Sequence, residues 1–274
     1  MTYQQRLNKH LADYKRTALS IQQPGDFRYG KTVVKHDHIL PAKSAWLNVL
    51  EPARTLAQQY LERHREIKLH RYFHHLNSSQ AFAFNLFFPY FAEPARAAVL
   101  LRALGQTASL KSWTTESIPV SREGTNVDIA WETTDGGTTF CEVKLSEGDF
   151  GKGKEDARHL QKLREIYSPA LVACIEADWL KPRRFFGCYQ IFRNVWHLTQ
   201  TPNSTLIFLL PRANTTLWKQ LEQTLSALST GILSRLAPIA IEDVIETLCG
   251  TGTAPGLAGY AEQLRRKYVP PESE

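Results

Sequence analysis

The chain has 274 residues, of which 43% are hydrophobic and 22% are charged. This balance is typical of a globular protein with a well-filled core and excludes a disordered or fibrous chain. The net charge of +6 is compatible with a polyanionic partner, but so modest a surplus does not establish one by itself.

The cysteines and the apolar segments bear on the compartment of the protein. The four cysteines form no CxxC pair and are widely scattered, which favours reduced thiols in the cytoplasm. The N-terminus has no apolar h-region, and the most apolar stretch, residues 81–92, is short and interrupted by Asn85 and Pro89. We therefore expect no signal peptide and no membrane span.

The first seventy residues predict helices around a loop. Residues 44–67 carry apolar side chains at helical spacing, from Trp46 through Leu50 to Leu61. We therefore interpret residues 1–70 as a helical N-terminal extension and residues 71–274 as a second domain.

The second domain begins with helical patterns and then changes period. Residues 77–91 predict a helix that Asn77 or Ser78 caps and that Pro89 bends or ends, and a further helix reaches Gly105. Period-two patterns then predict three strands, within residues 109–120, 126–131 and 138–145. Helix, strand, helix and strand follow at residues 154–167, 170–177, 183–198 and 204–211. This order predicts a mixed sheet flanked by helices, with the core at about residues 76–211.

Two acids and a lysine lie on the second and third of these strands. A three-residue loop at residues 135–137 would pair Thr134 with Thr138, which places Asp128 opposite Lys144 and diagonal to Glu142 on one face. Two converging carboxylates make a hard-oxygen site suited to Mg²⁺ or Mn²⁺. Such an ion and a neighbouring lysine carry out phosphodiester hydrolysis. An E-x-K pair alone is also ordinary salt-bridge decoration of a strand.

These residues resemble the signature of the PD-(D/E)XK nuclease superfamily, an Asp followed by a hairpin and then by Glu-x-Lys. The similarity is closest to its branch of restriction-endonuclease-like proteins, through "LNSSQ" at residues 76–80, "EVKLSE" at 142–147 and "YQIFRN" at 189–194. The resemblance covers about residues 70–211. It implies an αβββαβ core and a nuclease activity.

The resemblance also implies roles for individual residues. The implied catalytic residues are Asp128, Glu142, Lys144, Gln80 and Gln190. Asp128 and Glu142 would bind the metal together with the backbone carbonyl of Val143. Lys144 would lie at the nucleophilic water. Gln80 and Asn85 stand where many relatives have Glu, so whether one or two metal ions bind stays open, and simple helix capping is an equal alternative for Gln80 and Gln190.

A basic set flanks the signature and is a candidate for contact with nucleic acid. Its members are Lys152, Lys154, Arg158, Lys162, Arg183, Arg184 and Arg193. Lysine and arginine near a phosphodiester cleft neutralise backbone charge without reading base sequence. A solvated helix face is the alternative, and the acidic residues between them favour it in part.

Two other metal-binding patterns compete with this interpretation. Residues 35–41, "KHDHILP", resemble the first strand of an HNH nuclease, with Asn48 and His64 as candidate partners, but no second strand follows. The adjacent pair His74 and His75 lacks a third ligand at metal spacing. We expect a polar loop in the first case and no metal in the second.

The sequence thus predicts a cytoplasmic Mg²⁺- or Mn²⁺-dependent nuclease that acts on DNA, with a role in restriction or genome defence inferred from resemblance alone. A non-cleaving nucleic-acid-binding or regulatory protein on the same core is the alternative. RNA as the substrate, cutting from an end and sequence specificity all stay open. A homodimer would suit symmetric cutting of both strands, but nothing in the chain demands one.

Overall fold

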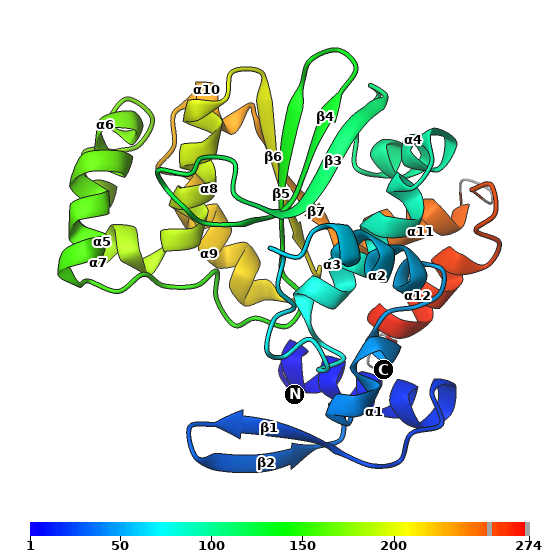
Figure 1. The fold of residues 1–274 in the computed structure, drawn as a ribbon. Helices are drawn as coiled ribbons and strands as arrows, with labels where there is room; N and C mark the ends of the chain where they lie inside the picture. Colours follow the sequence, from blue (N-terminus) through cyan, green and yellow to red (C-terminus); the bar gives the residue numbers. More distant parts are fainter. Residues whose placement is uncertain (251–253, 272–274) are drawn as a thin grey trace. The chain divides into compact units, whose positions relative to one another are not determined.

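The computed structural model describes residues 1–250 and 254–271, which form two compact units (Figure 1). We refer to residues 111–240 as the sheet unit, and to residues 1–110 with the segment from residue 241 onward as the helical unit. The predicted boundary between residues 70 and 71 does not coincide with this grouping.

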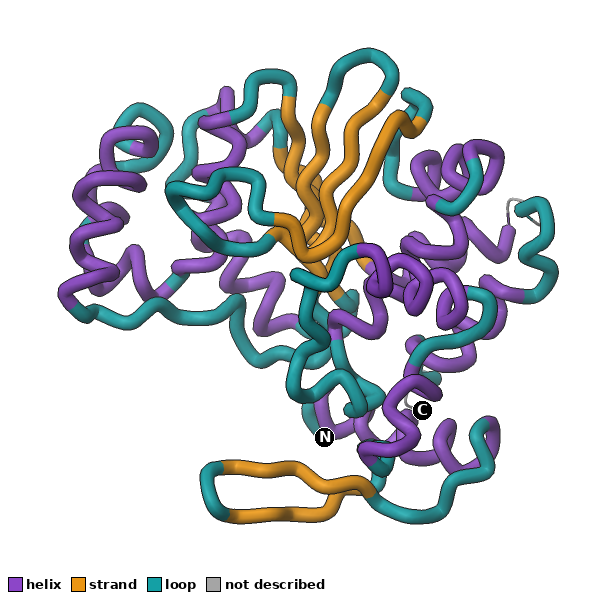
Figure 2. Tube along the Cα trace, in the orientation of Figure 1, coloured by secondary structure: helices purple, strands orange, loops and turns teal. Residues whose placement is uncertain are grey.

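The sheet unit is built on a five-stranded mixed sheet (Figure 2). In spatial order its strands are β3 (Leu110–Ser117), β4 (Val127–Thr133), β5 (Thr138–Val143), β6 (Ser204–Leu210) and β7 (Leu236–Ala240). β4 and β5 are antiparallel, whereas β5, β6 and β7 run parallel. The prediction of a mixed sheet flanked by helices, as in a restriction-endonuclease-like fold, is confirmed. β7 was not predicted.

Helical segments connect the parallel strands. Between β5 and β6 these are α5 (Ala157–Lys162), a π-helical segment (Leu163–Tyr167), α6 (Ser168–Leu171), a 3₁₀ turn (Ala177–Leu180), α7 (Pro182–Gly187) and α8 (Tyr189–Gln200). Between β6 and β7 lie α9 (Thr215–Leu225) and α10 (Thr230–Leu233). The predicted strand at residues 170–177 is wrong. The helical run continues to Leu171, and Ile175 makes only an isolated bridge to Leu228.

Helix α8 covers one face of the sheet. Its side chains Ile191, Phe192 and Val195 are fully buried and belong to one apolar cluster with Phe140 of β5 and Phe208 of β6. Each such side chain contributes roughly 1.5–3 kcal/mol on burial. Because side chains alternate along a strand, Glu142 projects from the same face of β5 as Phe140. The apolar cluster therefore holds α8 over the face that carries Glu142.

The helical unit contains a small sheet besides its helices. Its elements are α1 (Tyr3–Ala18), β1 (Gly25–Tyr29), β2 (Thr32–His36), a 3₁₀ helix (Ala42–Asn48), α2 (Ala53–Arg63), α3 (Ser79–Phe91), α4 (Pro94–Ala103), α11 (Ile241–Gly250) and α12 (Tyr260–Tyr268). The prediction of helices around a loop is therefore incomplete, because β1 and β2 form an antiparallel hairpin that turns at Gly30 (φ 58°).

The predicted helix at residues 44–67 is divided in two. The 3₁₀ helix ends at Asn48, and α2 begins after Pro52. Ser78 caps α3 as predicted, with its hydroxyl accepting a hydrogen bond from the Ala81 N–H. The helix then continues through Pro89 to Phe91.

Asn85 has a structural role in the helical unit. Its side chain is fully buried, accepts a hydrogen bond from the Leu50 N–H at 2.7 Å and donates to the Ala81 carbonyl at 2.8 Å. Its amide group also contacts the Tyr268 hydroxyl at 2.6 Å.

Within residues 1–250 and 254–271, the helices are too short or too polar to cross a bilayer.

Candidate active site at the carboxyl end of strand β5

The β4–β5 hairpin brings the two acids to one face by a register that differs from the predicted one. Ile129 pairs with Cys141, and Glu132 pairs with Thr138, so residues 133–137, rather than 135–137, lie between the last paired residues of the two strands. This register is shifted by two residues from the predicted one, and a shift of two leaves every side chain on its face. Continued by one step, it sets Asp128 directly opposite Glu142.

The loop itself explains the shift. The Thr133 N–H donates to the Gly137 carbonyl at 2.9 Å, and the Thr133 hydroxyl donates to the Asp135 carboxylate at 2.6 Å. Gly136, with φ 85°, supplies the left-handed turn. These bonds end the strand pairing at Thr138.

Asp128 is held against the neighbouring strand. Its Oδ2 accepts a hydrogen bond from the Val143 N–H at 2.8 Å, and its own carbonyl accepts one from the Thr115 hydroxyl at 2.9 Å. Burial raises the pKa of Asp128 well above its ordinary value, and the neighbouring Glu142 raises it further, against the opposing effect of Lys144. The two carboxylates are therefore electrostatic neighbours.

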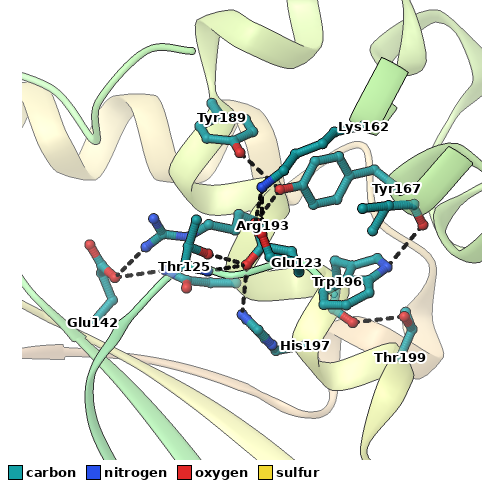
Figure 3. Close-up of polar contacts among 12 residues, drawn as sticks. Glu123, Thr125, Glu142, Lys162, Tyr167, Tyr189, Arg193, Trp196, His197 and Thr199 are labelled. Atoms are coloured by element: carbon teal, nitrogen blue, oxygen red, sulfur yellow. Dashed lines mark hydrogen bonds and ion pairs between the residues drawn. The ribbon is translucent and has the colours of Figure 1, made fainter. Parts of the chain in front are cut away.

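Both oxygens of the buried Glu142 carboxylate are engaged. Oε1 lies 2.7 Å from the Lys144 Nζ, and Oε2 accepts a hydrogen bond from the Asn194 amide at 2.9 Å. Arg193 lies 3.5 Å from the same Oε2 (Figure 3). Burial by itself raises the pKa of Glu142, but Lys144 and Arg193 outweigh it and lower that pKa. Glu142 is consequently an ionised group with its charge compensated by cations.

Lys144 lies between Glu142 and helix α8. Its Nζ donates to the Gln190 Oε1 at 2.6 Å, and its side chain is only 10% exposed. Burial lowers the pKa of Lys144, but Glu142 and Glu147 raise it more strongly, so the net shift is upward. Lys144 therefore stays protonated and acts as a fixed hydrogen-bond donor. The structure thus brings Gln190 to Lys144, while its catalytic role stays a prediction.

Helix α8 supplies a polar stripe that the sequence interpretation did not identify as a unit. Gln190, Arg193, Asn194 and His197 follow the spacing i, i+3, i+4 and i+7, which places them on one face of a helix. Their polar character on an otherwise apolar helix was the signal that could have revealed Asn194 and His197. Arg193 was predicted to contact nucleic acid, but here it is 11% exposed and lies against Glu142.

A second buried acid, Glu123, lies beside the same stripe (Figure 3). It accepts hydrogen bonds from the Thr125 N–H at 2.9 Å and from the Tyr167 hydroxyl. The Lys162 Nζ lies 3.7 Å from its Oε1 and donates to its backbone carbonyl. Burial raises the pKa of Glu123, but these hydrogen bonds and Lys162 together outweigh burial, so the net shift of that pKa is downward. Lys162, from the predicted basic set, therefore has an internal partner.

His197 completes the group without a strong bond. Its Nε2 is 3.9 Å from Glu123, and burial lowers the pKa of His197 to about 4 despite the opposing effect of that acid. In the part of the chain that the structure describes, five buried side-chain atoms lack a hydrogen-bond partner. Four of them lie on α8, namely Arg193 Nε, Asn194 Oδ1 and both ring nitrogens of His197. The interior beside Glu142 therefore contains buried hydrogen-bond donors and acceptors of α8 that have no protein partner.

The remaining predicted residues lie elsewhere. The other members of the predicted basic set are exposed, namely Lys152, Lys154, Arg158, Arg183 and Arg184. Two of them form surface ion pairs: Lys152 lies 3.7 Å from Asp149, and Arg184 lies 2.5 Å from Asp178. Gln80 belongs to the helical unit, where it accepts a hydrogen bond from the His70 N–H at 2.8 Å and donates to the Lys68 carbonyl at 3.3 Å. Its predicted catalytic role stays a prediction.

The HNH alternative finds no support in these contacts. His36 ends strand β2, and Asp37 and His38 form the turn that follows. The Asn48 amide donates to the main-chain carbonyls of Phe73 and His75 at 2.7 and 2.6 Å, while the His64 ring stacks on Tyr60. These groups serve packing and local hydrogen bonding.

The site offers a divalent ion few acidic ligands. Among the described residues, no group of three or more His, Cys, Asp or Glu side chains is placed to hold a metal. A metal would therefore rely on two carboxylates, a carbonyl and water, which is a set that suits Mg²⁺. Burial and, after it, Glu142 raise the pKa of Asp128, so a cation bound between the two carboxylates would favour the ionised form of Asp128. The residues fit such an ion, which would share Glu142 with Arg193 and Asn194.

Comparison with known proteins adds one match. The family model described as restriction endonuclease associating with ARP matches residues 8–269. No curated protein and no solved structure matches the chain.

Proposed function

The chain belongs to the family of restriction endonucleases associating with ARP, and on that premise we propose that it is a metal-dependent nuclease of the PD-(D/E)XK type that cleaves DNA. The observation that supports the proposal is the arrangement of three charged groups on the β4–β5 hairpin. Asp128 and Glu142 are opposed on one face, and the Lys144 Nζ lies 2.7 Å from the Glu142 carboxylate.

Each residue of the candidate site has a distinct part in this proposal. Asp128 and Glu142, with the carbonyl of Val143, would hold a divalent ion, which would supply stabilisation of negative charge on the scissile phosphate. Lys144, protonated and fixed by Gln190, donates hydrogen bonds to the attacking water or to a phosphate oxygen. Asn194 orients the Glu142 carboxylate through a 2.9 Å hydrogen bond.

The proposed setting follows from the same family membership. Restriction of foreign DNA requires an endonuclease, so we propose internal cleavage of duplex DNA. All four cysteines, which lie within the described residues, are free thiols, and this supports a reducing compartment such as the cytoplasm.

The test is cleavage of supercoiled plasmid by the purified protein with Mg²⁺ or Mn²⁺. We compare the wild type with Asp128→Asn, Lys144→Ala and the control Glu132→Gln, which removes an exposed acid of the same strand that pairs with Lys111 at 3.0 Å. The two site variants should lose about 10²–10⁴ in rate, as expected for removal of a catalytic group. The control should retain the wild-type rate, and EDTA should abolish cutting.

Folding is checked on the same samples by circular dichroism and urea unfolding. Cutting that persists unchanged in both site variants would show that another group, or a contaminant, hydrolyses the DNA. A second outcome would also refute the proposal. If the folded wild type cuts neither duplex DNA, single-stranded DNA nor RNA, and if the wild type and Asp128→Asn bind these nucleic acids with equal affinity, the protein is a non-catalytic binder.

A further inference from the structure

An open groove lies in the sheet unit between the loop after β5 and helix α9. It has a volume of about 960 Å³. One wall consists of Gly148, Asp149 and Lys152, and the other carries Arg212, Trp218 and Lys219. None of the groove's groups belongs to the proposed catalytic set.

The groove lies beside the candidate active site because of the sheet topology. β5 and β6 are parallel, so their carboxyl ends meet at one edge of the sheet, which is where ligands bind in open α/β sheets. The Lys144 N–H donates to the Leu209 carbonyl at 3.0 Å. The two walls of the groove are the segments that follow these paired ends.

Two further hydrogen bonds tie α9 and its N-cap residue to the loop after β5. The Asn214 amide donates to the Glu147 carbonyl at 3.0 Å, and the Phe150 N–H donates to the Gln220 side chain at 3.0 Å. The loop between these bonds follows Lys144 directly and forms one wall of the groove. The position of the groove relative to Lys144 is therefore fixed by the chain.

The chemistry of the groove suits a sugar-phosphate backbone. Lys219 and Arg212 are exposed. The groove also contains Lys152, which lies 3.7 Å from Asp149, and a second acid, Glu222. The Trp218 indole N–H already donates to the Pro211 carbonyl at 2.9 Å, so the ring offers the groove an apolar surface. Cations that contact phosphates bind a nucleic-acid backbone without reading its sequence, and the ring adds an apolar surface beside them.

We propose that this groove binds the backbone of the DNA that flanks the scissile phosphate, with Lys219 and Arg212 as its phosphate contacts. The inference rests on the proposed nuclease function and extends it, because neither residue belongs to the predicted basic set. That set lies on the segment from residue 152 to residue 193, whereas these contacts come from the segment after β6.

The test measures binding separately from cutting. Fluorescence anisotropy of a short labelled DNA duplex, in EDTA and over a series of salt concentrations, compares the wild type with the double variant Arg212→Ala/Lys219→Ala. The matched control is Lys111→Ala/Arg164→Ala, which removes two exposed cations of the sheet unit outside the groove. Unfolding curves confirm that all three proteins are folded.

We expect the groove variant to bind about tenfold more weakly at low salt, with a salt slope smaller by about 1.8, because each phosphate contact contributes about 0.9. The control should stay within about twofold of the wild type. Equal weakening of both double variants would overturn the groove and leave general surface charge as the cause. Tighter binding of RNA than of duplex DNA, with no effect of the groove variant on the duplex, would also overturn it.

Cleavage by the same proteins separates the two proposals. If the wild type cuts plasmid in an Asp128-dependent manner while the groove variant binds and cuts like the control, the nuclease stands and the groove is wrong. If the groove variant loses binding but the wild type never cuts, the groove stands as a nucleic-acid site and the nuclease proposal is wrong. A wild type that binds no nucleic acid overturns both.

Discussion

Replacement of Glu123 by glutamine should destabilise the sheet unit although this residue lies outside the proposed catalytic set. The Glu123 carboxylate is fully buried and accepts hydrogen bonds from Thr125 and Tyr167. Lys162 lies 3.7 Å away, and its side chain is 18% exposed. Glutamine keeps the shape but replaces one acceptor oxygen by a donor and removes the charge that Lys162 faces.

The size of the effect follows from these contacts. Removal of one partner of a buried ion pair destabilises a protein by about 3–5 kcal/mol. Partial exposure allows Lys162 to recover some hydration, while the hydrogen bonds to Glu123 weaken from the charged to the neutral kind, a loss of about 1 kcal/mol. We therefore expect Glu123→Gln to lower the free energy of unfolding by about 2–4 kcal/mol at pH 7.

The pH dependence has a definite sign. The pKa of Glu123 is lowered in the folded protein, so its ionised form stabilises the fold above its ordinary pKa of about 4.3. That contribution is lost as the pH falls through the lower, folded pKa. The difference between the wild type and Glu123→Gln should consequently shrink at acid pH.

Urea unfolding followed by circular dichroism measures both effects. Glu165→Gln, which changes an exposed acid of the same unit, is the matched control and should stay within about 0.5 kcal/mol of the wild type. A double-mutant cycle with Lys162→Met isolates the ion pair. A loss below about 1 kcal/mol for Glu123→Gln, or a loss that does not change between neutral and acid pH, would refute the reasoning.

Two other substitutions test the site. Asp128→Asn should raise the free energy of unfolding in EDTA by about 0.5–2 kcal/mol, because burial and Glu142 raise the pKa of Asp128 and make its charge unfavourable. This gain should grow as the pH rises and the wild-type acid ionises, and urea unfolding that shows a loss would contradict it. Gly151→Ala should destabilise the folded protein by about 1–3 kcal/mol, because φ at this residue is 87° and a Cβ would lie 2.7 Å from the Gln190 side chain. The control Gly148→Ala places its Cβ in open space and should change the thermal unfolding temperature little.

The strand faces could be predicted from the sequence, but the register could not. Alternation along β4 and β5 is a local property, and any shift by an even number of residues preserves it. The register depended on bonds among Thr133, Asp135 and Gly137, which compete with strand pairing and have no periodic pattern. The shared face of Asp128 and Glu142 was therefore predictable, and their direct opposition was not.

Short apolar segments were the other source of error. Residues 170–177 were predicted as a strand, yet the buried Leu171 ends a helical run, and the buried Ile175 lies beyond that run in an isolated bridge. Such runs fit a buried helix as well as a strand. β7 escaped prediction because it is short and contains Pro238, which a sheet tolerates only at an edge, and β7 is an edge strand.

The partners of the acids could not be predicted, because they depend on distant parts of the chain. The spacing of Gln190, Arg193 and Asn194 marks one face of a helix, but only tertiary packing sets that face against β5. Glu123 lies in a loop without a pattern, and its burial follows from Tyr167, 44 residues away.

The separation along the chain between Glu142 and its partners on α8 affects the order of events during synthesis. Asp128 and Glu142 belong to one hairpin, which needs only a short loop to close, whereas Asn194 reaches Glu142 across 52 residues. Local contacts form early, and distant ones wait for the chain between them. A nascent chain that ends before α8 therefore carries both acids and Lys144 but lacks Arg193 and Asn194, which also contact Glu142. We expect the Glu142 carboxylate to take its final position only after α8 has been made and packed on the sheet.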